Sequence, residues 1–138
     1  MNNQIRPGAL AIAGGGALIL IASFIDWFVI FSAWENRIFG LVGLLLLLVA
    51  AILIAVPLIR MFAPQVSLPE RVVGFTLNQL MLALGFAVFV FGFSWMFADG
   101  SEFGCILAWI GGAVAVAGAF LEDKAGAAPV SGGPARPF

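Results

Sequence analysis

The chain has 138 residues, of which 63% are hydrophobic and 9% are charged, and its formal net charge is −1. A soluble domain carries about 25% charged residues, so this chain has too little charge to cover a surface that faces water. The composition therefore excludes a soluble globular protein and predicts an integral membrane protein.

Missing residue types exclude several kinds of chemistry. The chain contains no histidine and one cysteine, Cys105. Without histidine there is no imidazole ligand for haem or zinc and no histidine general base. Because its net charge is near zero, the chain also lacks the clustered basic surface that binding to nucleic acid requires. We therefore expect no cofactor, no metal, no nucleic-acid partner and no enzymatic activity.

Four apolar segments are long enough, or nearly so, to cross the membrane, which needs a helix of about 20 residues. No charged side chain lies inside any of them. The predicted helices cover residues 8–25, 38–59, 72–97 and 104–121. This pattern predicts an all-α membrane protein, an antiparallel four-helix transmembrane bundle within residues 1–121.

The composition of the chain changes after Leu121. Glu122, Asp123 and Lys124 lead into a run of alanine, glycine, proline and serine. Such a run cannot bury an apolar face. We therefore expect residues 122–138 to form a disordered tail.

Basic residues flank the spans unevenly. With four spans, the N-terminus, the second connection and the C-terminal tail share one side of the membrane. Loops that are rich in lysine and arginine stay in the cytoplasm, which places both termini there, in an inner or plasma membrane. Five of the six basic residues lie on that side, namely Arg6, Arg60, Arg71, Lys124 and Arg136, and Arg37 lies on the other.

The opposite side is acidic and rich in tryptophan. Indole rings favour the boundary between membrane and water. Asp26 is placed to form an ion pair with Arg37 across the first connection, as a structural clamp. The residues expected at this outer interface are Asp26, Trp27, Trp34, Glu35, Arg37, Trp95 and Trp109.

Small residues recur at helical spacing in the first and fourth segments. Helices associate in lipid through close backbone approach at small residues. The first segment packs against the fourth, against a second copy or against another protein. The predicted packing rows are Gly104, Ala108 and Gly112; Gly111, Ala115 and Ala119; and Ala9, Ala13 and Ala17.

The third segment carries the amide pair Asn78 and Gln79, with Thr76 before it and Ser94 after it. Amides within a membrane hydrogen-bond across helices, contributing about 0.6 kcal/mol on average. We expect this structural role here. The alternative is a polar pathway lined by all four side chains.

Two functions agree with these features. The first is a small, non-catalytic accessory or assembly subunit that packs against membrane partners or against itself, surrounded by membrane lipids. The second is a homo-oligomeric channel or passive carrier for a small ion or solute. Ion-coupled transport is disfavoured, because ionisable residues inside the membrane usually mark such coupling and none lies at the centre of these spans.

Overall fold

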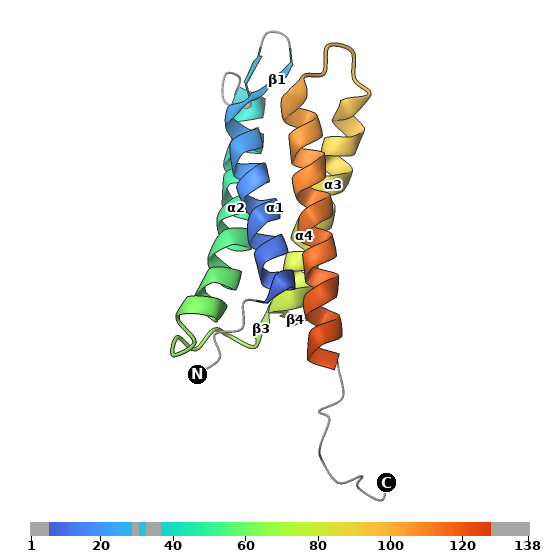
Figure 1. Ribbon diagram of the computed structural model, residues 1–138. Coiled ribbons are helices and arrows are strands. Elements are labelled where there is room, and N and C mark those ends of the chain that lie inside the picture. The colour runs from blue at the N-terminus through green and yellow to red at the C-terminus, as the bar shows by residue number, and fades with distance from the viewer. Residues whose placement is uncertain (1–5, 29–30, 33–36, 128–138) are drawn as a thin grey trace, which may run out of the picture.

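Four long helices make up most of the computed structural model, which describes residues 6–28, 31–32 and 37–127 (Figure 1). All four are long and apolar enough to cross a membrane. Two short antiparallel strand pairs occupy the first two connections. In chain order the elements are α1 (Pro7–Phe24), β1 (Asp26–Phe28), β2 (Phe31–Ser32), α2 (Arg37–Phe62), β3 (Arg71–Val72), β4 (Phe75–Thr76), α3 (Leu77–Met96) and α4 (Phe103–Ala127).

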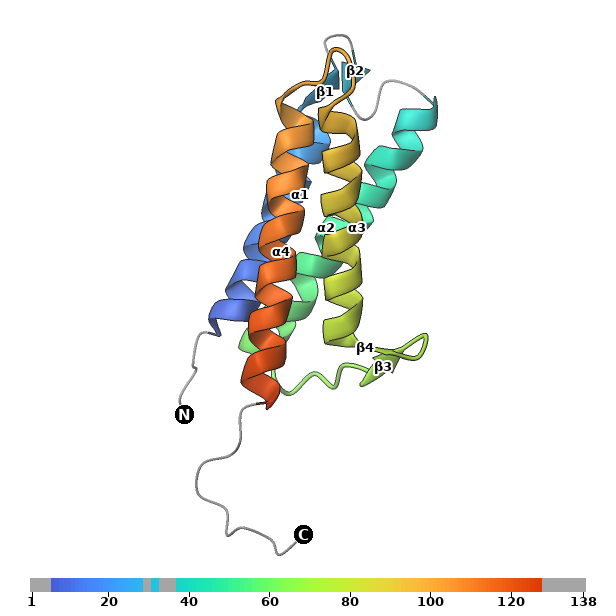
Figure 2. The ribbon, with the colours of Figure 1, turned by 90° about the vertical axis from the view of Figure 1, so that its right-hand side faces the viewer.

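The helices are arranged side by side in the order α2, α1, α4, α3. Helix α4 packs extensively against both α1 and α3, and α1 also packs against α2. Helices α2 and α3 touch only slightly, and Figure 2 shows α2 inclined to α3. The bundle is therefore closed on three sides and open between α2 and α3.

Glycines bring the backbones of α1 and α4 together. A Cβ atom added at Gly15 would lie 2.5 Å from the carbonyl oxygen of Gly111. One added at Gly118 would lie 2.7 Å from the carbonyl oxygen of Gly8. On each helix the two glycines are seven residues apart, which is within about 20° of two full turns. Both pairs therefore lie along a single seam, in which residue numbers rise along α1 as they fall along α4.

A second seam joins α4 to α3. A Cβ atom added at Gly112 would lie 2.5 Å from the backbone nitrogen of Phe89, and one added at Gly92 would lie 2.8 Å from that of Trp109. Because Gly111 and Gly112 are adjacent, α4 meets α1 and α3 with neighbouring faces. With close backbone contact on two faces, α4 is an inner helix of the bundle, beside α1.

The predicted small-residue face of α4 is buried inside the chain, divided between these two seams. The buried positions include Gly104, Ala108, Gly111, Gly112, Ala115 and Ala119. The intramolecular contact expected between the first and fourth segments is present.

The row predicted on the first segment is partly wrong. Ala9 is buried and Ala13 is half-buried, but Ala17 is exposed. Residues at four-residue spacing are displaced around the helix axis by about 40° at each step. The last residue of the row, Ala17, therefore points away from α4. The backbone of α1 comes closest to α4 at Gly8 and Gly15.

The third helix begins five residues later than predicted, at Leu77 instead of residue 72. Val73 and Gly74 have positive φ angles of 52° and 84°, which produces a two-residue hairpin turn between β3 and β4. Thr76 and Gln79 then form a capping box at the start of α3. These local bonds end the hairpin and fix the first residue of the helix.

The fourth helix continues to Ala127, so the prediction of disorder is wrong for residues 122–127. Residues 128–138 of the expected tail lie outside the described residues. The polar residues just after Leu121 stay helical because they bond to other helices, as described below. Helix α2 likewise runs to Phe62, three residues beyond the predicted end.

Candidate functional site

Polar side chains from α2, α3 and α4 and from the residue before α1 gather at the end of the bundle where α1 begins and α4 ends. Arg6 immediately precedes α1, Arg60 lies in the last turn of α2, and Asn78 lies in the first turn of α3. Glu122 and Asp123 come from α4. These five residues and Gly126 line a cavity of about 550 Å³, which we call the terminal cavity.

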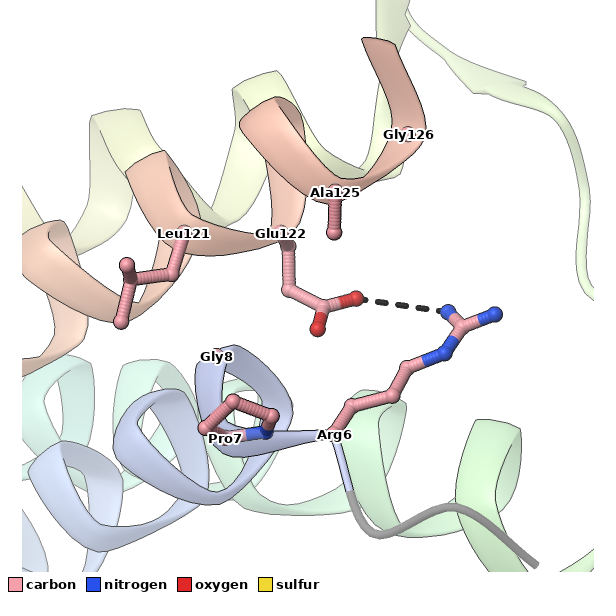
Figure 3. A pocket seen from close by; sticks show the side chains of 7 residues that line it. All are labelled: Arg6, Pro7, Gly8, Leu121, Glu122, Ala125 and Gly126. Carbon is pink, nitrogen blue, oxygen red and sulfur yellow. Dashed lines mark hydrogen bonds and ion pairs between the residues drawn. The ribbon is translucent and has the colours of Figure 1, made fainter. Parts of the chain in front are cut away.

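Glu122 joins the end of α4 to the start of α1 (Figure 3). Its Oε2 atom accepts a hydrogen bond of 3.3 Å from Nη1 of Arg6, and its Oε1 atom accepts one of 3.2 Å from the backbone N–H of Ala9. The first N–H groups of a helix have no acceptor within that helix. A negative charge at this end also interacts favourably with the helix dipole. Glu122 therefore caps α1 from a different helix.

The two side chains of the ion pair differ in their exposure to solvent. The Glu122 side chain is 8% exposed, whereas that of Arg6 is 60% exposed. A second cavity of about 320 Å³ also has both residues in its lining, together with Pro7, Gly8 and Leu121 (Figure 3). The pair thus borders two neighbouring cavities at this end of the bundle.

Asn78 holds α3 to α4. Its Nδ2 atom donates to the carbonyl oxygen of Ala119 at 3.0 Å and to Oδ1 of Asp123 at 3.3 Å. Both partners are acceptors, so they fix which end of the amide is the nitrogen. The Oδ1 atom of Asn78 is buried and receives no donor from the described part of the chain. The amide forms the cross-helix hydrogen bond expected from its position in a membrane span.

The other three residues of the alternative pathway bond within their own segment. Thr76 and Gln79 are exposed and exchange the two hydrogen bonds of the capping box. Ser94 is exposed and donates to the carbonyl oxygen of Val90, four residues earlier on α3. Of the four predicted pathway residues, Asn78 is the one that bonds to another helix.

Two tryptophans of the predicted outer interface contact phenylalanine rings of α3, Trp109 from α4 and Trp95 from within α3 itself. The ring of Trp109 lies 5.8 Å from that of Phe89, and its indole nitrogen is buried without an acceptor among residues 6–28, 31–32 and 37–127. Trp95 is half-buried, with its ring 6.0 Å from that of Phe91. Trp109 was expected at the water boundary, but the close α3–α4 contact encloses its polar atom.

The remaining residues of that interface belong to the first connection and to the start of α2 in the sequence. Trp34 and Glu35 lie outside the described residues. Asp26 and Trp27 belong to β1, and Arg37 is the first residue of α2, but their side chains lie outside the description. The ion pair between Asp26 and Arg37 stays a prediction.

An apolar groove of about 270 Å³ lies on the open side of the bundle. Sequence reasoning missed it, because α2 is apolar at almost every position and so gives no periodic signal of which face is covered. The groove is lined by Val42, Leu45, Leu46 and Val49 of α2 and by Ala87, Val88 and Phe91 of α3.

Neither a metal site nor a known relative adds to this description. Within the ranges that the structure describes, no group of three or more histidine, cysteine, aspartate or glutamate side chains could hold a metal ion. In comparisons with known proteins, no family model, no curated protein and no solved structure matches the chain. The terminal cavity and the groove are features of the described residues that offer room for a ligand or a partner.

The cap formed by Glu122 predicts an uneven loss of stability. Glu122→Ala should lower the free energy of unfolding by about 1–2 kcal/mol, because the first turn of α1 loses its acceptor. Arg6→Ala should cost less than about 1 kcal/mol, since that side chain is mostly exposed. Reversible unfolding of both variants and of the double variant in detergent micelles measures their coupling.

Glu70→Ala is the control for that experiment, because Glu70 is an exposed acid in the connection before β3 and is not part of the cavity lining. Its effect should stay within about 0.5 kcal/mol. If Glu122→Ala destabilises the protein no more than Glu70→Ala does, Glu122 does not cap α1.

Proposed function

We propose that the chain is a multi-pass protein of an inner or plasma membrane and forms an antiparallel four-helix transmembrane bundle. Its role is that of a non-catalytic accessory or assembly subunit, which packs against a membrane partner or against a second copy. Four helices of membrane-spanning length support the first part of this proposal. The hydrogen bond between Arg6 and Glu122 also supports an antiparallel arrangement, since it holds the start of α1 and the end of α4 at the same end of the bundle.

The basic residues support a cytoplasmic position for both termini. Arg6 and Arg60 line the terminal cavity, and Arg71 and Lys124 lie in β3 and near the end of α4. Positive charge next to a span is retained in the cytoplasm. The end of the bundle that holds the terminal cavity is therefore the cytoplasmic end.

Single cysteines introduced on either side test this orientation in a Cys105→Ala background. Asp99→Cys lies in the turn between α3 and α4, and Ser67→Cys lies in the connection between α2 and β3; both positions are exposed. In intact cells, a maleimide that cannot cross the membrane should label position 99 and should label position 67 only after permeabilisation. The reverse pattern would place the termini outside.

The open side of the bundle is the observation that carries the assembly role. The two predicted small-residue rows of α4 are already buried against α1 and α3, so these rows leave no close-packing surface for an outside partner. An added helix must therefore contact another face. The groove between α2 and α3 is apolar and is bordered by helices that barely touch each other.

A second copy of the chain is the occupant that this surface fits best. Helix α3 exposes Phe86, Val90 and Phe93. Ring contacts of 6.2 and 6.4 Å join Phe86 to Phe89 and Phe89 to Phe93 in one row. At about 100° per residue, this row lies on the side of α3 opposite to the groove. One copy can therefore insert its rings into the groove of the next, as a heterologous contact. Van der Waals packing of this kind drives helix association in lipid.

Filling the groove should prevent self-association. Ala87 is exposed and lines the groove, so the indole ring of Ala87→Trp would occupy the space that the second copy needs. We expect the dissociation constant of the dimer to rise at least about tenfold, which corresponds to about 1.4 kcal/mol. Energy transfer between labelled copies in liposomes, at a series of protein-to-lipid ratios, measures this constant.

Ala117→Trp is the matched control, because Ala117 is exposed on α4, away from the groove residues. It should leave the dissociation constant unchanged. A wild-type protein that stays monomeric at every protein-to-lipid ratio would exclude self-association. An equal loss in both variants would exclude the groove as the interface.

A further inference from the structure

The terminal cavity contains more polar chemistry than the packing of four helices needs. Its volume of about 550 Å³ lies within the range of about 300–1,000 Å³ that is typical of ligand pockets. Two guanidinium groups, two carboxylates and one amide line it. The hydrogen bonds of these groups decide which of them are available to a ligand.

Most of these groups already have a partner. The Glu122 carboxylate is used by Arg6 and by the backbone of Ala9. Asp123 accepts from Asn78 through Oδ1. Arg60 differs, because it is half-buried and no carboxylate in the described ranges lies within ion-pair distance of it. The Glu122 carboxylate attracts the Arg60 guanidinium from beyond ion-pair distance. The guanidinium has five N–H donors, and burying it in part without a hydrogen-bonded anion is costly.

The position of Arg60 indicates where its partner comes from. It lies in the last turn of α2, two residues before the end of an apolar helix that is long enough to cross a membrane. Whichever way the chain is inserted, this turn lies close to the level of the lipid headgroups. Phosphate is the anion present there, and a guanidinium binds phosphate through two parallel hydrogen bonds.

We propose that the terminal cavity binds a phospholipid headgroup whose phosphate is held by Arg60. Arg6 lines the same cavity and uses Nη1 for Glu122, so it supplies a second positive charge. This inference goes beyond the assembly role, and it requires neither the groove nor the proposed orientation.

Asp123 selects the kind of headgroup. It is exposed, it lines the cavity, and its carboxylate lies on the same cavity wall as Asn78. A carboxylate attracts an ammonium group and accepts hydrogen bonds from it. Ethanolamine carries N–H donors beside its phosphate, whereas choline has none. The cavity therefore prefers phosphatidylethanolamine over phosphatidylcholine.

Lipid titration of the full-length protein tests this proposal. The delipidated protein in neutral detergent is titrated with phosphatidylethanolamine, with phosphatidylcholine or with inorganic phosphate, and native mass spectrometry counts the bound molecules. We expect phosphatidylethanolamine to bind about tenfold more tightly than either of the other two probes. Equal binding of the two lipids overturns the headgroup selection. Binding of inorganic phosphate as tight as that of lipid assigns the cavity to a soluble phosphate and overturns the membrane source.

Charge-removing variants locate the site. Arg60→Gln should weaken the binding of phosphatidylethanolamine about tenfold. Arg71→Gln is the matched control, since Arg71 is exposed in β3 and is not part of the cavity lining; it should change binding less than about twofold. Equal losses in the two variants would show that the positive charge of the surface acts without a defined site, and would overturn the proposal.

Asp123→Asn provides a second test that does not depend on Arg60. The position is exposed, so the variant should fold even if Arg60→Gln does not. It should bring the affinities for phosphatidylethanolamine and phosphatidylcholine to within about twofold of each other, with little change for phosphatidylcholine. An unchanged preference for phosphatidylethanolamine excludes Asp123 as the selecting group and overturns the proposal.

Discussion

Close backbone contact along α4 is the constraint on which the rest of the structure depends. Glycines at positions 111 and 118 meet α1, and Gly112 meets α3. In lipid, apolar side chains gain nothing from leaving their surroundings, so contact of this kind must hold the helices together. Since α1 and α3 already cover two faces of α4, α2 packs on the other side of α1 and makes few contacts with α3. The groove on the open side follows from that arrangement.

The register of the same contact positions the polar end of the bundle. Gly118 meets Gly8 across the first seam, so one turn further along α4 the Glu122 carboxylate reaches the backbone N–H of Ala9 in the first turn of α1. Asn78 then ties the start of α3 to the same turns of α4. The terminal cavity thus forms from residues as far apart in the chain as Arg6 and Gly126. Packing of glycines in the apolar part of the bundle determines which charges meet at its end.

Local sequence predicted what depends on local composition. Four helices of spanning length follow from apolar runs, and the cross-helix bond of Asn78 follows from an amide placed in such a run. The start of α3 was missed because Val72 and Phe75 are apolar but belong to a hairpin. The helical state of residues 122–127 depends on distant partners that a local pattern does not contain. The seven-residue spacing of Gly8 and Gly15 could have predicted the first seam. The prediction instead followed alanines at four-residue spacing.

Unfolding of three glycine variants tests the central role of α4 most directly. Gly111→Ala and Gly112→Ala place a Cβ atom 2.8 Å from the carbonyl oxygen of Gly15 and 2.5 Å from the backbone nitrogen of Phe89, respectively. Gly14→Ala meets no atom within 4 Å. In reversible unfolding in mixed micelles, each α4 variant should lose about 1–3 kcal/mol, whereas Gly14→Ala should lose none. Equal stability of all three variants would contradict close packing of α4 against both neighbours.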